Sequence, residues 1–164
     1  MIYQHTHAWI FDVSPHTGEP KRLTSRLVKP GETLERYDPM YKDGLYVWND
    51  ITQRCVYSEG QSRAVQPART AKAIGRITIE AIKRYDVRDI SEAEARAEGF
   101  ARSVDFLMIW CKMHDKQVVL PIIPDYETGL ITWANMQDCL AARPAKHYDA
   151  WQLAICPEVI RRRG

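Results

Sequence analysis

The sequence lacks three features that would each indicate a particular class of protein. Its four cysteines are widely spaced and form no C-x-x-C pair, which argues against a zinc ribbon and against a disulfide framework. No apolar run reaches the length of a membrane span, and the first residues are too polar for a secretory signal peptide. We therefore expect a soluble, cytoplasmic protein with reduced, mostly buried thiols, no membrane partner, and neither a metal nor another cofactor.

An excess of charge of one sign is also missing. The 164 residues carry 23 Lys and Arg against 21 Asp and Glu, a formal net charge of +2. The chain as a whole is therefore not a polyanion binder, and any affinity for nucleic acid must come from local clusters of positive charge. A hydrophobic content of 45% over this length predicts a single domain with a sizeable core.

Short strands dominate the local patterns. In the clearest of them, Ile77, Ile79 and Ala81 alternate with polar neighbours and predict one buried face. Residues 34–43 are polar and irregular, so we expect a loop there. Runs of β-branched and aromatic residues between turn signals predict strands at 7–13, 23–28, 44–48, 54–58, 62–66, 74–82, 118–123 and 150–155.

Three other stretches predict helices. Ser91 and Glu94 form an S-x-x-E capping box, and Gly99 suits the left-handed residue that ends a helix. Further helices are predicted at 103–113 and 130–142. Short strands around a central pair of helices indicate an α+β protein, a small, mixed, mostly antiparallel β-barrel with helices packed around it.

The most distinctive segment is Gly18–Arg26, which places a lysine, a threonine and two arginines directly after a turn containing glycine and proline. Alternation along a strand would put Thr24 and Arg26 on one face and would turn Lys21 away from Thr24 if the strand already began at Lys21. Lys21 and Thr24 converge only if Lys21 lies in an irregular loop before the strand. The segment is therefore either a reactive pocket or a solvated basic strand.

Three separated pieces of the chain, in this order, resemble the ASCH family, whose fold is similar to the PUA RNA-binding barrel. The first is G-x-x-K-x-x-T-x-R at 18–26, the second is the strand followed by Asp-Ile-Ser at 75–91, and the third is A-x-A-E-G at 95–99. Many members carry an N-terminal helix where this chain has the strand-like 7–13. The resemblance implies one PUA-like domain over 1–164, with a core of about 18–114 plus the strand 149–156, and a variable insertion at 117–148.

The resemblance also implies an activity. Small members of the family hydrolyse the amide of N4-acetylcytidine without a metal, and the motifs assign the nucleophile to Thr24, the general base to Lys21 and the general acid to Glu98. A threonine hydroxyl needs an adjacent base to become a nucleophile. A lysine can be that base if burial and nearby positive charge lower its pKa toward neutrality. Backbone amides or an arginine would stabilise the oxyanion.

Substrate-binding residues are expected among the basic and aromatic side chains. A small nucleoside or nucleobase amide would contact Arg26, stack on Tyr57 and meet Arg69 and Arg76 at the loop around Pro67.

Two other functions stay open. The same arginines and tyrosine would suit a non-catalytic reader of single-stranded RNA or of a modified base. A ribonuclease is the other possibility, with Lys21 and Glu98 as acid and base for attack by a 2′-hydroxyl. Acidic residues are interleaved with the basic ones, which is equally typical of an ordinary soluble surface.

Overall fold

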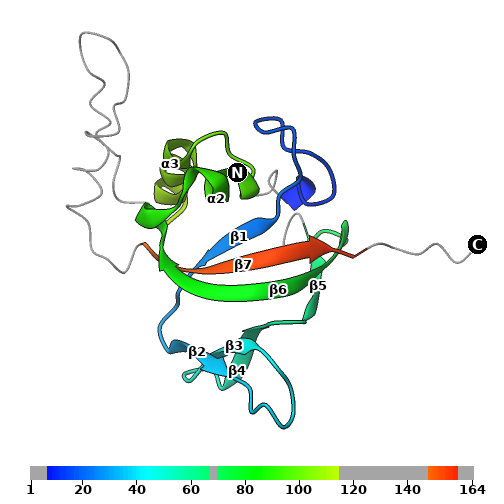
Figure 1. The fold of residues 1–164 in the computed structure, drawn as a ribbon, viewed down its shortest axis with the longest axis vertical. Coiled ribbons are helices and arrows are strands. Elements are labelled where there is room, and N and C mark those ends of the chain that lie inside the picture. The colour runs from blue at the N-terminus through cyan, green and yellow to red at the C-terminus, as the bar shows by residue number, and fades with distance from the viewer. Residues whose placement is uncertain (1–6, 67–69, 115–147, 159–164) are drawn as a thin grey trace, which may run out of the picture.

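The computed structural model describes residues 7–66, 70–114 and 148–158 (Figure 1). Arg69, the predicted strand at 118–123 and the predicted helix at 130–142 lie outside these residues. Of the predicted insertion at 117–148, only Tyr148 is described.

The described strands form two antiparallel sheets, one of four strands and one of three. This is the mixed α+β architecture that the sequence predicted. In spatial order, the larger sheet consists of β1 (Leu23–Leu27), β7 (Asp149–Pro157), β6 (Gly75–Asp86) and β5 (Ser62–Val65), and the smaller of β2 (Glu32–Arg36), β3 (Leu45–Asn49) and β4 (Arg54–Ser58).

Strand β7 lies inside the larger sheet and separates its two faces. Because side chains alternate along a strand, the neighbours Ala150 and Trp151 point to opposite sides. Trp151 is fully buried with Val47 and Ile79, between the larger sheet and the smaller one. Ala150 is fully buried on the other face, where helices cover the sheet (Figure 1). The larger sheet is thus the middle layer, with a separate core on each side.

Two short helices, α2 (Glu92–Ala97) and α3 (Ser103–His114), form that covering layer, and a 3-10 turn at Val87–Asp89 leads into them. The predicted capping box is confirmed: the Ser91 hydroxyl accepts from the Glu94 N–H at 3.0 Å, and the Glu94 carboxylate accepts from the Ser91 N–H at 3.0 Å. Phe106, Leu107 and Trp110 bury one side of α3 in the core beneath.

Gly99 ends the first of these helices for two reasons. Its φ of +96° lies in the left-handed region that side chains rarely adopt, as the sequence predicted. A Cβ at this position would also lie 2.5 Å from the ring of Trp9. The indole therefore packs directly against the end of α2, and only glycine leaves room for it.

The predicted strand at 7–13 is wrong, because this stretch is a helical turn. The Ile10 N–H donates to the carbonyl of His7 at 3.2 Å, and the Asp12 N–H donates to that of Ala8 at 3.0 Å. These local bonds satisfy the backbone without a partner strand. Trp9 packs edge-on against Phe100, with ring centroids 5.9 Å apart, so tertiary contacts override the β-like composition.

Two further expectations about strands are corrected. Residues within 34–43 were expected to be a loop, but β2 pairs Leu34 with Val47 and buries its apolar side in the inter-sheet core. Ala81 was expected to be buried, but the register of β6 shifts between Ile79 and Ala81. A β-bulge of this kind reverses the alternation. Ala81 is consequently exposed and Ile82 is buried in its place.

The described cysteines are free thiols, but burial of most of them was not a correct expectation, because Cys111 is buried whereas Cys55 and Cys156 are exposed. No helix in the described part of the chain is both long and apolar enough to cross a membrane.

Candidate active site

Lys21 lies in the irregular loop that leads into β1, which is the placement that its convergence with other reactive groups requires. Its N–H donates to the carbonyl of Trp9 at 2.8 Å, and the next N–H, of Arg22, donates to the carbonyl of Ala97 at 2.7 Å. These two bonds attach the loop to the N-terminal turn and to the end of α2. The Lys21 side chain leaves the alternation of the strand and is buried, with the residue 6% exposed.

The structure brings Lys21 and Glu98 together. Lys21 Nζ lies 3.1 Å from Glu98 Oε2, and the two side chains are 8% and 2% exposed. Glu98 is the C-cap residue of α2, and its N–H donates to the carbonyl of Glu94 at 2.9 Å. Removing both charges from water costs several kcal/mol per ion, and their attraction repays this only when further hydrogen bonds satisfy the remaining atoms. The surroundings of Glu98 supply such bonds.

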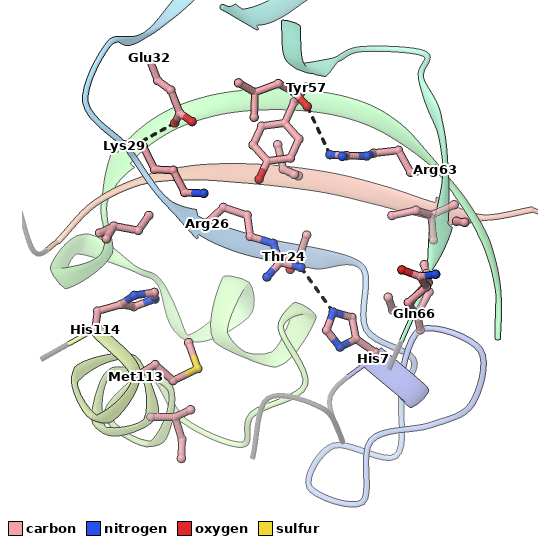
Figure 2. A pocket seen from close by; sticks show the side chains of 18 residues that line it. His7, Thr24, Arg26, Lys29, Glu32, Tyr57, Arg63, Gln66, Met113 and His114 are labelled. Atoms are coloured by element: carbon pink, nitrogen blue, oxygen red, sulfur yellow. Dashed lines mark hydrogen bonds between the residues drawn. The ribbon is translucent and has the colours of Figure 1, made fainter. Parts of the chain in front are cut away.

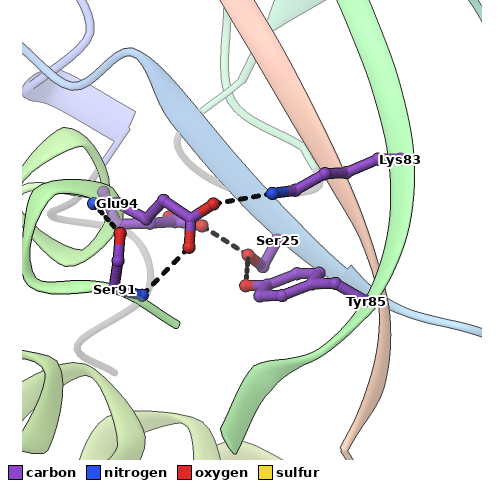
Figure 3. Close-up of polar contacts among 6 residues, drawn as sticks. Ser25, Lys83, Tyr85, Ser91 and Glu94 are labelled. Carbon is purple, nitrogen blue, oxygen red and sulfur yellow. Dashed lines mark hydrogen bonds and ion pairs between the residues drawn. The ribbon is translucent and has the colours of Figure 1, made fainter. Parts of the chain in front are cut away.

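A serine and a tyrosine provide them. Ser25 Oγ donates to Glu98 Oε1 at 2.5 Å, and it lies 2.5 Å from the Tyr85 hydroxyl. Figure 3 shows the Tyr85 side chain extending from β6 to β1, where its hydroxyl meets that of Ser25. The sequence interpretation missed both residues. The signal for Ser25 was present, since alternation places it on the face of β1 opposite Thr24.

The Tyr85 hydroxyl is protonated at neutral pH. Burial raises its pKa above the ordinary value for tyrosine, and the Glu98 carboxylate raises it further, while the hydrogen bond with Ser25 acts in the opposite direction. The phenol is therefore a hydrogen-bond donor within this buried group.

Thr24 lies in a different cavity. Its side chain lines a cleft of about 1050 Å³, together with Arg26 and Tyr57, on the other face of β1 from Ser25 (Figure 2). Lys21, Ser25 and Glu98 instead line a cavity of about 20 Å³. The described contacts therefore join two of the three predicted catalytic residues and leave Thr24 apart from them.

The two cavities adjoin at helix α3. Ile109 and Met113 line both the large cleft and the small cavity. Thr24 and Ser25 are consecutive residues of β1, which is an edge strand of its sheet. The buried ion pair and the threonine hydroxyl are thus on opposite faces of one edge strand, and the same two α3 side chains line both cavities.

Tyr57 and two arginines give the large cleft an aromatic face and positive charge. Arg63 lies over the Tyr57 ring at 5.1 Å from its centroid, and Figure 2 shows the Tyr57 hydroxyl directed toward Arg26. Burial raises the pKa of the Tyr57 hydroxyl, while the charges of Arg26 and Arg63 lower it. The net shift is upward, so a neutral phenol with an aromatic face lies between two guanidinium groups. Such a face can stack on a nucleobase.

Glu32 is the one acidic residue that the structure describes in the lining of this cleft, and sequence interpretation missed it. It is 6% exposed. Its Oε2 accepts from the indole N–H of Trp151 at 2.8 Å and from the N–H of Lys29 at 3.0 Å. Because both bonds use the same oxygen, Oε1 remains as an acceptor for a ligand hydroxyl or N–H in the cleft.

The remaining predicted substrate-binding residues do not join this group. Arg76 lines neither cavity: its Nε donates to Ser62 Oγ at 3.0 Å and lies 3.8 Å from the Glu158 carboxylate, and its side chain is 53% exposed. Arg69 lies outside the described residues.

In residues 7–66, 70–114 and 148–158, no three side chains of His, Cys, Asp or Glu are grouped so that they would hold a metal ion.

Comparisons with protein-family models, with curated proteins and with solved structures find no match for this chain.

Proposed function

We propose that this protein is a metal-independent amidohydrolase that removes the acyl group from N4-acylated cytosine nucleosides or related small amides. The observation that carries the proposal is the buried contact between Lys21 Nζ and Glu98 Oε2, 3.1 Å apart. A buried pair of ionisable groups beside a cleft is a common arrangement for acid–base catalysis. The proposal includes a PUA-like, ASCH-type domain in which the two sheets form a barrel around their shared core.

The large cleft is the substrate site in this proposal. The cytosine ring stacks on Tyr57, and Arg26 follows Thr24 on the same face of β1 and lines the same cleft. Thr24 then attacks the acyl carbon, and the guanidinium of Arg26 stabilises the oxyanion of the tetrahedral intermediate. A volume of about 1050 Å³ accommodates a nucleoside with its acyl group.

The Lys21–Glu98 pair holds a single exchangeable proton between a base and an acid. In the charged form the proton is on Lys21, and in the neutral form it is on Oε2 of Glu98. Burial disfavours separated charge, so the neutral form is accessible in this cavity. It contains the two groups that the reaction needs, an unprotonated lysine and a protonated carboxyl.

Acylation uses this neutral form. As Thr24 Oγ1 bonds to the acyl carbon, its proton moves to Lys21 Nζ, and Glu98 gives its proton to N4 of cytosine. The carbon–nitrogen bond breaks, the nucleoside leaves as the free amine, and an ester remains on Thr24. The pair is left in its charged form, with an ammonium at Lys21 and a carboxylate at Glu98.

Deacylation reverses these roles. A water attacks the ester carbonyl and transfers a proton to the Glu98 carboxylate, while the departing Thr24 oxygen takes the proton of Lys21. The carboxylic acid is released and the neutral pair is restored. Both steps require Lys21 and Glu98 to reach around the edge of β1 toward Thr24 and the substrate, where Ile109 and Met113 line both cavities.

The test is release of cytidine from N4-acetylcytidine by the purified protein, followed by chromatography. We expect turnover by the wild type and a loss of about 10²–10⁴ in kcat for Lys21→Met, the usual range for a general base. Lys42→Met is the matched control, because Lys42 contacts Ser58 on the smaller sheet. The proposal is overturned if the wild type releases no more cytidine than Lys21→Met.

A non-catalytic RNA or modified-base reader is the second candidate. It is favoured by the charge of the cleft, where Arg26, Lys29 and Arg63 face a single carboxylate that is already hydrogen-bonded. Binding of a short single-stranded RNA that weakens steeply with salt and is unchanged by Thr24→Val would support this function. Cleavage of the same RNA over time would instead support a ribonuclease.

A further inference from the structure

Tyr85, Ser25 and Glu98 form a hydrogen-bonded series of which the proposed reaction itself uses only Glu98. Tyr85 lies on β6 and Ser25 on β1, with β7 between them. Strand pairing places Leu27, Ala150 and Tyr85 in one row across the sheet. The neighbouring row on the same face consists of Ser25, Gln152 and Lys83. Tyr85 packs on the core that contains Ala150, whose small side chain leaves the phenol room to cross β7 and reach Ser25.

The direction of each hydrogen bond follows from the number of protons available. A serine hydroxyl has one proton to donate. Ser25 donates it to Glu98 Oε1 at 2.5 Å, so in its contact with Tyr85 the Ser25 oxygen must accept. The phenol is therefore the donor, which agrees with the raised pKa of Tyr85 and its protonated state. The series runs from Tyr85 to Ser25 to Glu98.

We infer that Tyr85 and Ser25 are positioning residues that occupy Oε1 of Glu98 with a fixed donor, so that Oε2 is the only oxygen through which Glu98 exchanges a proton with Lys21. The catalytic consequence rests on the proposed amidohydrolase function, whereas the effect on Glu98 itself does not. We call the hydrogen bonds from Tyr85 to Ser25 and from Ser25 to Glu98 the relay. Without the relay, either carboxyl oxygen of Glu98 can carry the proton, and the acid is properly oriented in only part of the molecules.

The surroundings of Glu98 contain few other charges that would perform this task. Helix α3 contributes Phe106, Ile109, Trp110 and Met113 to the small cavity, all without charge. Glu94, on the same helix as Glu98, is held by Lys83 at 2.6 Å and by the N–H of Ser91. Among the described residues, Lys21 from the loop before β1 contacts Glu98 directly, Tyr85 from β6 reaches it through Ser25, and Glu94 pairs with Lys83 instead.

The direct test is the titration of Glu98, measured by NMR on protein labelled with ¹³C at the glutamate carboxyls. A hydrogen bond to the carboxylate favours the charged form, so its removal raises the pKa. We expect the Glu98 midpoint to move upward by about one pH unit in Ser25→Ala and by less in Tyr85→Phe, where Ser25 still donates. Ser25→Thr keeps the hydroxyl and should restore the wild-type midpoint.

Tyr37→Phe is the matched control. It removes another tyrosine–serine hydrogen bond, between the Tyr37 hydroxyl and Ser58 Oγ at 2.8 Å on the smaller sheet, and should leave the Glu98 midpoint unchanged. If Ser25→Ala and Tyr85→Phe are folded and neither moves the midpoint relative to Tyr37→Phe, the relay is overturned.

Kinetics then separate the relay from the proposed reaction. In an active enzyme we expect Tyr85→Phe to lower kcat by about tenfold with little change in KM, and to shift the acidic limb of the pH–rate profile upward. An unchanged kcat and profile would overturn the positioning role. A wild type without turnover overturns the proposed function alone, because the shift of the Glu98 titration would still establish the relay.

Discussion

Lys21 Nζ lies 3.1 Å from Glu98 Oε2, with both side chains removed from solvent, although one residue precedes the first strand and the other ends a helix. The backbone holds this relationship in place. The loop at Lys21 and Arg22 is attached to Trp9 and Ala97, and Trp9 in turn packs against Gly99. Three segments distant in sequence are thus fixed together at the point where the two opposite charges meet.

The first prediction concerns the stability of this pair. Lys21→Met leaves the Glu98 carboxylate buried without its cation, and we expect the free energy of unfolding to fall by about 3–5 kcal/mol. The double variant Lys21→Met/Glu98→Leu removes both charges and should recover most of this loss. Urea denaturation measures both. A double variant no more stable than the single one would contradict the reasoning, because the loss would then come from packing.

The second prediction concerns Thr24. Thr24→Val keeps the shape of the side chain and removes the hydroxyl, so the protein should remain folded and should still bind the nucleoside. We expect turnover of N4-acetylcytidine to be abolished, because the ester on Thr24 cannot form. Thr24→Ser should retain activity, and mass spectrometry of quenched reactions should detect the acyl-enzyme. If Thr24→Val remains active, the nucleophile is a group other than Thr24.

Much of this site was within reach of the sequence because local signals specify it. The S-x-x-E capping box and Gly99 define where α2 begins and ends, and they therefore place Glu98. The proline-containing loop before β1 allowed Lys21 to depart from strand alternation. Both features depend on residues close in sequence, where propensity and capping rules apply.

The partners of that site were not within reach, because they depend on strand order and on tertiary contacts. Ser25 meets Tyr85 only because β7, from the C-terminal part of the chain, lies between β1 and β6. No periodicity specifies this order. Likewise, the bulge that exposes Ala81 leaves no clear trace in an alternating pattern, and the helical turn at 7–13 depends on the contact of Trp9 with Gly99. These are cases in which packing overrides local preference.

The third prediction concerns Glu32 in the large cleft. Glu32→Gln keeps an oxygen that can accept from the Trp151 indole and the Lys29 N–H, so we expect little loss of stability. It replaces the acceptor at Oε1 by a donor, and a ligand hydroxyl or N–H at that position loses its partner. We expect KM for the nucleoside substrate to rise by about tenfold, with kcat nearly unchanged.

Glu32→Leu provides the contrasting variant. It leaves the buried indole N–H of Trp151 without an acceptor, at a cost of about 1–3 kcal/mol, and should lower the thermal midpoint. Equal stability of Glu32→Leu and the wild type would show that this carboxylate does not anchor Trp151. An unchanged KM in Glu32→Gln would exclude Glu32 from substrate binding.

The last prediction concerns the dependence of stability on pH. Burial by itself would raise the pKa of Glu94, but the hydrogen bonds from Lys83 and the Ser91 N–H outweigh it and hold the pKa below its ordinary value. Hydrogen bonds from Arg88 outweigh burial in the same way at Asp86. A carboxyl whose pKa is lower in the folded state stabilises the fold above its unfolded pKa, and this contribution is lost as the pH falls through the folded pKa.

We therefore expect the urea midpoint to decline as the pH is lowered from about 5 toward 3, the range in which such carboxyls become protonated. The decline should be shallower in Glu94→Gln, which no longer titrates, while Glu35→Gln on the smaller sheet, an exposed carboxyl that accepts from Thr33, serves as the control. A decline equally steep in Glu94→Gln and in Glu35→Gln would mean that the Lys83–Glu94 contact adds no stability through its charge.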